Sequence, residues 1–163
     1  MPKSSAHNAY TLIEILIVIS IIGLLMGIGI LQYRDYARRQ SLTSAARSMV
    51  ADLRLIQENS LSGMKPASGC SSLNGYRIVV STASYYYVAV CDNGAGPVEI
   101  ASTKKTPTPP ADTNYTPNGT SVMFKILGQG TDLVNDISIT VKQVSTANTQ
   151  TIGISKGGKI TWP

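Results

Sequence analysis

The sequence predicts an α+β fold in which a long N-terminal helix packs on a C-terminal antiparallel β-sheet. The first observation behind this prediction is an almost wholly apolar run of 22 residues, 10–31, followed by an amphipathic stretch that continues to Leu61. The second is that the hydrophobic period changes from helical to two in residues 62–163. We therefore expect a helix over residues 10–61 and a globular β-rich domain over residues 62–163.

Composition favours a segment adapted to a membrane. Charged residues make up 14% of the 163 residues, against about 25% in typical soluble domains. The formal net charge is +5. The single histidine, His7, precedes the apolar run, and two cysteines cannot complete a four-ligand zinc site. Histidine-based catalysis and zinc-ribbon folds are therefore poor explanations of the chain.

The apolar run has the length of a membrane span. As a helix it extends roughly 33 Å, which matches a bilayer core of roughly 30 Å, and residues 12–31 are the expected transmembrane part. A cleaved secretory signal is one alternative, but its apolar region has only about 7–15 residues. A buried core helix is another, although a run without a polar face fits lipid better than a small core.

Beyond the apolar run the helix becomes striped. Tyr33 and Tyr36 follow the run where interfacial aromatic residues are expected. Apolar residues then recur at spacings of three and four, and charged residues lie on the opposite face. The apolar stripe contains Leu42, Ala46, Met49, Leu53 and Ile56, and the charged face contains Arg38, Arg47, Arg54 and Glu58. The helix is expected to end near Leu61.

A period of two marks the strands of the domain. Residues 76–81 and 85–91 predict a hairpin, and residues 104–119 contain four prolines and predict an exposed loop. We expect about six or seven strands in one antiparallel sheet, with one face against the helix stripe. The later strands are expected at 122–127, 137–142, 151–155 and 159–162.

Glu14 is the only ionisable residue in the apolar run. A carboxylate costs about 2.5–3.5 kcal/mol at the centre of a bilayer and less toward an end, so an intramembrane acid indicates a function. A basic group of a neighbouring subunit is one candidate partner. A free α-amine four residues earlier, made by cleavage between Ala9 and Tyr10, is another. The structural alternative is an acid that reaches the lipid headgroups.

The residues Ala9-Tyr-Thr-Leu-Ile-Glu14, followed by about twenty apolar residues and LQYRDY, resemble the processing signal of type IV pilins and type II secretion pseudopilins. The resemblance implies that a prepilin peptidase removes the leader 1–9 after Ala9 and methylates the amine of Tyr10. It also implies that Glu14 pairs with the terminal amine of a neighbouring subunit. The implied partners are other pilin subunits, the prepilin peptidase, the inner-membrane assembly platform and the membrane itself.

Two positions depart from the family pattern. The family usually has glycine where this chain has Ala9, so cleavage is expected to be slower. It often has a proline that kinks the helix where this chain has Leu31, so any loosening of the helix on assembly would have to occur at Gly27 and Gly29.

Charge and resemblance disagree on topology. Arg34, Arg38 and Arg39 follow the span while only Lys3 precedes it, which by charge alone keeps the C-terminal side in the cytoplasm. The resemblance implies the reverse: a single-pass protein of the cytoplasmic membrane whose domain lies outside the cytoplasm and later enters a pilus or pseudopilus. We give the resemblance precedence because its leader must face the cytoplasm.

The two cysteines agree with that topology. Cys70 and Cys91 could close a 22-residue loop in an oxidising compartment, worth roughly 3 kcal/mol. Two unrelated buried thiols are the alternative.

The rest of the chain more weakly resembles the FimT/GspH-type minor pilins and pseudopilins, which end in a strand pair around a turn with glycine and basic residues. Some members bind DNA through a Gly-Arg-x-Arg motif, and the corresponding residues here are Gly158-Lys159-Ile-Thr. Lys156 and Lys159 are therefore tentative phosphate contacts, and we expect weak DNA binding or none, with a solvated hairpin tip as the favoured explanation.

Other chemistry is poorly supported. The acidic loop with Asp132, Asn135 and Asp136 lacks the glycine and terminal glutamate of a calcium loop, so no metal or other cofactor is expected. No recognisable nucleophile motif is present, so we expect no enzyme. The favoured function is a structural, minor subunit of a pilus or pseudopilus. The alternatives are a DNA-binding minor pilin of a transformation pilus and a single-span tethered binding domain that does not polymerise.

Overall fold

The computed structural model describes residues 11–162, without the side chains of residues 28–31. The leader and the cleavage junction at Ala9 and Tyr10 lie outside the described residues, as does the side chain of Leu31. One helix, α1 (Leu12–Leu61), contains 50 residues. The chain divides into two units after Arg38, and α1 contributes to both.

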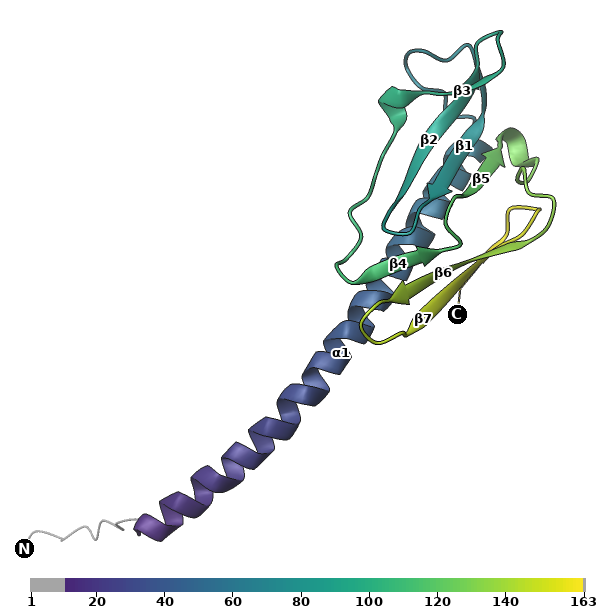
Figure 1. Cartoon of the computed structure of the whole chain (residues 1–163). Helices are drawn as coiled ribbons and strands as arrows, with labels where there is room; N and C mark the ends of the chain where they lie inside the picture. The colour runs from purple at the N-terminus through teal and green to yellow at the C-terminus, as the bar shows by residue number, and fades with distance from the viewer. Residues whose placement is uncertain (1–10, 163) are drawn as a thin grey trace, which may run out of the picture. The chain divides into compact units, whose positions relative to one another are not determined.

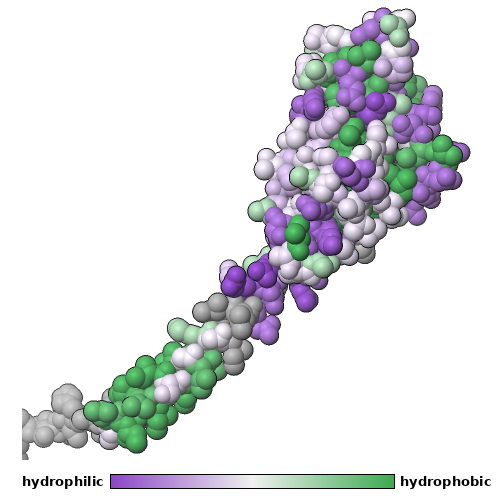
Figure 2. Space-filling view, viewed as in Figure 1, coloured by the Kyte–Doolittle hydropathy of each residue, from purple (hydrophilic) through white to green (hydrophobic). Residues whose placement is uncertain are grey.

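The first unit, as far as it is described, is the apolar part of α1. Its most apolar window has a mean hydropathy of 2.7, and no part of that window is buried. Figure 2 shows hydrophobic side chains on the visible face of this part of the helix. By length and composition the helix is therefore able to cross a membrane.

The second unit contains the end of α1 and two four-stranded antiparallel sheets (Figure 1). The first sheet has the order β3-β2-β1-β5 and the second has the order β4-β6-β7-β8. Two short 3-10 helices, η1 (Ala101–Thr103) and η2 (Ile126–Gly128), lie in the connections. The strands are β1 (Ser72–Val80), β2 (Tyr85–Asp92), β3 (Pro97–Glu99), β4 (Thr113–Thr116), β5 (Thr120–Lys125), β6 (Ile137–Gln143), β7 (Thr149–Ile154) and β8 (Ile160–Thr161).

One hydrophobic core joins the helix to both sheets. The stripe predicted from the sequence is buried, and it shares a cluster with the inner faces of the strands. Burying a large aliphatic side chain contributes about 1.5–3 kcal/mol, so this core is the main force that holds the second unit together. Its members on α1 include Leu42, Ala46, Met49, Leu53 and Ile56, and those on the strands include Ile78, Val80, Val122, Phe124, Ile139, Val141, Ile152 and Ile154.

The α+β class and the first hairpin are confirmed, but the strands are arranged differently from the prediction. The expected single sheet is two sheets, and β4 lies inside residues 104–119, which were expected to be a loop. β4 forms because Tyr115 is buried and its strand pairs with β6. The strand expected at 122–127 ends at Lys125, because Leu127 turns the backbone into the left-handed region with φ +55°.

Candidate functional site

The helix that carries Glu14 begins with a capping residue. Thr11 precedes α1, and both its carbonyl oxygen and its Oγ1 accept the Glu14 backbone N–H, at 3.1 and 3.3 Å. A threonine in this position satisfies a backbone donor that the first helical turn leaves free. Glu14 therefore lies in the first turn of α1, where the partial positive charge of the helix terminus favours a carboxylate.

The Glu14 side chain is exposed in the single chain. Within residues 11–162 the recorded ion pairs are Arg38 with Asp35 and Arg77 with Glu99, and neither involves Glu14. The neighbouring exposed side chains are apolar, such as Ile13, Ile15 and Leu16. An acid in these surroundings loses its hydration when such a helix enters an apolar environment.

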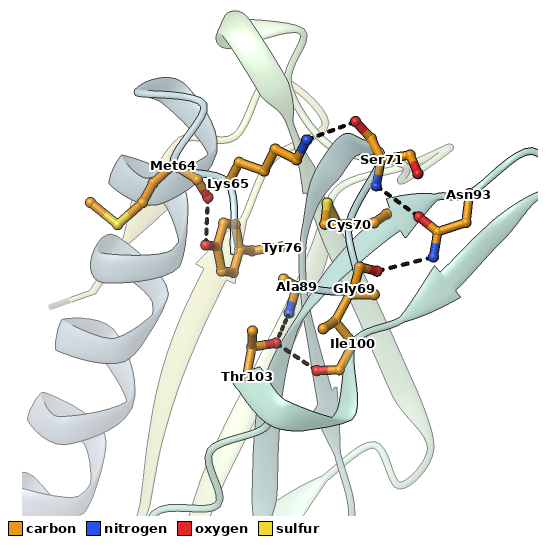
Figure 3. Close-up of a disulfide and its surroundings, with 11 residues drawn as sticks. Met64, Lys65, Gly69, Cys70, Ser71, Tyr76, Ala89, Asn93, Ile100 and Thr103 are labelled. Carbon is orange, nitrogen blue, oxygen red and sulfur yellow. Dashed lines mark hydrogen bonds between the residues drawn. A yellow bond between two sulfur atoms is a disulfide. The ribbon is translucent and has the colours of Figure 1, made fainter. Parts of the chain in front are cut away.

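The predicted disulfide is present. Cys70 and Cys91 are bonded, with their Cα atoms 5.4 Å apart, and Figure 3 shows their surroundings. The Asn93 side chain accepts the Ser71 N–H at 2.8 Å and donates to the Gly69 carbonyl at 3.0 Å. The disulfide and this amide together fix the connection between α1 and β1 to the end of β2. No pattern in the sequence predicted the role of Asn93.

Asp52 makes polar contacts with tyrosines of the strands, which the sequence did not indicate. The Tyr85 hydroxyl donates to Asp52 Oδ2 at 2.7 Å, and Tyr87 and Tyr115 also lie near this carboxylate. Burial, followed by Asp52, raises the pKa of Tyr85, and the same two causes raise the pKa of Tyr115 to about 12. Because β2 and β4 belong to different sheets, Asp52 connects α1 with both.

We expect Asp52→Ala to lower the free energy of unfolding by about 2 kcal/mol, because the buried Tyr85 hydroxyl loses its charged acceptor. The measurement is chemical denaturation of the full chain in detergent micelles. Glu58→Ala removes an exposed carboxylate from the same helix and is the matched control. Equal losses from the two variants would show that the tyrosine contact is not stabilising.

The turn with the tentative DNA contacts is held from two sides. Gln57 on α1 donates to the Gly158 carbonyl at 2.8 Å, and Asp136 accepts the Lys156 backbone N–H at 2.8 Å. The turn exposes both Lys156 and Lys159. The structure therefore brings the two lysines together, but it places a carboxylate beside them, which opposes a phosphate backbone.

We expect the full chain in detergent to bind duplex DNA weakly or not at all at physiological salt, because two lysines release few counterions. The measurement is a filter-binding titration with a labelled duplex at two salt concentrations. A chain with both Lys156→Ala and Lys159→Ala is the comparison. Tight retention that this variant abolishes would contradict the expectation.

The acidic side chains of the loop that contains Asp132 and Asp136 bond to backbone N–H groups. Within residues 11–162 no three acidic, histidine or cysteine side chains are grouped so as to hold an ion. Asp132, in the proposed acidic loop, accepts the Met123 N–H at 2.8 Å, and Asp136 is bonded to Lys156. These two carboxylates therefore have structural roles in connecting loops.

Comparison with known proteins finds a family motif at the N-terminus and two similar curated proteins. The prokaryotic N-terminal methylation motif matches residues 4–30. Two curated proteins of Pseudomonas aeruginosa, both named fimbrial protein, are each 34% identical to the chain over 106 residues. The alignment covers 60% of this chain and 68% of each relative. No solved structure matches significantly.

Proposed function

Because the chain belongs to the type IV pilin-like fimbrial proteins, we propose that it is a minor subunit of a type IV pilus or type II secretion pseudopilus, of the FimT/GspH type. Proteins of this family are processed by a prepilin peptidase and assemble with other pilin subunits. The proposal assigns the leader to residues 1–9, the cleavage to the bond between Ala9 and Tyr10, and the methylation to the Tyr10 amine. The apolar part of α1 anchors the processed chain, and the β-rich domain lies outside the cytoplasm.

Glu14 carries the proposal. It is a carboxylate in the first turn of an exposed apolar helix, and no ion pair within residues 11–162 involves it. Cleavage before Tyr10 would create an α-amine four residues earlier in every subunit. A neighbour displaced along a bundle of like helices would bring its amine to this carboxylate, and a desolvated pair of this kind favours one register over others.

Assembly then needs little change in hydrophobic burial. The apolar half of α1 leaves lipid and enters a bundle of similar helices, so packing and the charge pair select the arrangement. The two sheets remain at the surface, because the amphipathic half of α1 already buries its stripe against them. The minor role is supported by the weaker resemblance in the C-terminal strands and in the turn at Lys156 and Lys159.

Processing distinguishes this proposal from a simple membrane tether. We expect the intact mass of the chain, purified from a host with a prepilin peptidase, to correspond to loss of the first nine residues and gain of about 14 Da from one methyl group. Ala9→Leu places a large side chain before the scissile bond, and its mass is expected to retain the leader. A parent chain that keeps residues 1–9 in the same host would indicate a tethered domain.

A further inference from the structure

β7 has an outer edge that is only partly paired. On one side all six of its residues pair with β6. On the other side β8 pairs only with Gly153 and Ile154. Within residues 11–162 no strand pairs with the outer edge of residues 149–152.

The direction of the free backbone groups follows from bonds at both ends of the strand. Gln143 N–H donates to the Asn148 carbonyl on the β6 side, and Ser155 N–H donates to the Lys159 carbonyl on the β8 side. Backbone groups of successive residues face opposite sides of an antiparallel strand. The N–H and C=O groups of the odd-numbered residues of β7 therefore face its outer edge. Thr149 and Thr151 thus present unpaired N–H and C=O groups, and both residues are exposed.

The outer edges of β3, β4 and β5 are occupied or protected. Thr82 accepts the Tyr115 N–H of β4, and residues 130–132 pair with the outer side of β5. β3 begins with Pro97 and carries the charged Glu99. In contrast, the sequence of β7, TQTIGI, contains no proline and no charge, which are the usual means of preventing strand addition.

A groove lies at the start of this edge. It has a volume of about 360 Å³ and is lined by Asn148, Thr149 and Gln150 on one wall and by Arg39, Leu42 and Thr43 of α1 on the other. The lining on the sheet side therefore comes from the start of β7 and the residue before it. The Arg47 guanidinium, two turns of helix beyond Arg39, lies 5.7 Å from the centre of the Trp162 ring.

We propose that an extended, acidic segment of a partner protein adds to the second sheet as a strand along Thr149–Thr151, with its carboxylates facing Arg39 and Arg47. Backbone hydrogen bonds to the two threonines supply affinity, and the arginines select for negative charge. Asp112, which directly precedes β4, accepts the backbone N–H of Ser145 on the β6–β7 connection. The inference rests on the proposed function only for the place of binding, which would be the surface of the filament.

A second copy of this chain fits the edge less well. Antiparallel pairing of β7 with itself would bring Arg39 of one copy toward Arg47 of the other, so like charges would meet. Trp162 follows β8 and so continues toward the position opposite Ile152, which shortens the edge available to a whole sheet. A single strand requires less space and supplies the missing negative charge.

The test uses the full chain in detergent micelles and a labelled peptide of alternating valine and glutamate. We expect it to bind about tenfold more tightly than the matching valine–lysine peptide, a difference of about 1.4 kcal/mol. We also expect hydrogen exchange at the Thr149 and Thr151 amides to slow on binding. N-methylation of alternate peptide residues should abolish binding, because it removes the donors that face the edge.

Two variants locate the peptide. Arg39→Glu should reverse the preference in favour of the lysine peptide, whereas Arg54→Glu, an exposed arginine of α1 outside the groove, should leave it unchanged. Thr151→Pro removes an N–H that faces the outer edge, and the backbone donors of β7 that bond to β6 are kept. This variant should weaken peptide binding about fivefold. If Thr151→Pro fails to fold, the pair of arginine variants still decides.

Three results would overturn the proposal. These are equal effects of Arg39→Glu and Arg54→Glu, binding without protection of the two threonine amides, and protection that rises with protein concentration in the absence of peptide. The last result would identify a second copy as the occupant. None of these measurements involves filament assembly. If the chain enters filaments but does not bind the acidic peptide, the strand-addition proposal is wrong and the proposed function is unaffected.

Discussion

Replacing Glu14 with glutamine is expected to leave cleavage and methylation intact and to reduce entry into filaments on the order of 100-fold. In the proposed bundle the Glu14 carboxylate neutralises the Tyr10 amine of a neighbouring subunit. Removing one partner of a desolvated pair costs about 3–5 kcal/mol, because the remaining charge is left without compensation. Glutamine has nearly the same size and is uncharged, so the change tests charge rather than packing.

The measurement compares the amount of this chain in sheared filaments with the amount left in the membrane, for the parent and the variant. Glu58→Gln makes the same chemical change at an exposed position of α1 and is expected to assemble like the parent. Intact mass of the membrane fraction shows whether processing occurred. A Glu14→Gln chain that is processed normally and joins filaments as well as the parent would disprove the proposed pairing.

The helix was predictable because its signals are local. The apolar run requires only a count of residues, and the stripe of Met49, Leu53 and Ile56 requires only the helical period. Both features appear in α1, which ends at Leu61. Glu14 was also found locally, as one charge in an apolar run, but its partner was not, because the proposed partner belongs to another molecule.

The division into two sheets was not predictable from the same signals. A period of two reports which face of a strand is buried, but it does not report which strand lies beside it. β4 shows the difference: its four residues follow a proline-rich segment, and they become a strand because Tyr115 enters the core and β6 supplies the hydrogen bonds. Long-range pairing of this kind leaves no periodic pattern in a segment so short.

The polar contacts between Asp52 and the tyrosines were not predicted for a similar reason. Its position beside Leu53 marks it only as a polar residue at the edge of the stripe. Three tyrosines from two strands converge on it in the folded chain, and the sequence contains no spacing that connects them. The cysteines were easier, since a chain with only two of them offers a single intramolecular pairing.

Gly75 offers the sharpest test of how the first sheet is built. It lies in the middle strand, opposite Val90 of β2 and Lys125 of β5, beside an irregularity in the β1–β2 register. Its φ is +154°, and a Cβ at this position would lie far inside van der Waals contact of the Phe124 carbonyl oxygen. The obstacle is backbone rather than a flexible side chain, so β1 and β5 would have to separate.

We expect Gly75→Ala to lower the free energy of unfolding by about 4 kcal/mol, because overpacking against a strand adds to the cost of a positive φ. Gly94→Ala is the matched control, since Gly94 also has a positive φ, +95°, but has no neighbour within 4 Å of the added Cβ. We expect this control to lose about 1 kcal/mol. Denaturation in detergent micelles, followed by the fluorescence of the single tryptophan, Trp162, measures both variants. Equal losses would mean that backbone conformation alone requires glycine here, whereas a much larger loss for Gly75→Ala would assign that requirement to the close approach of β5.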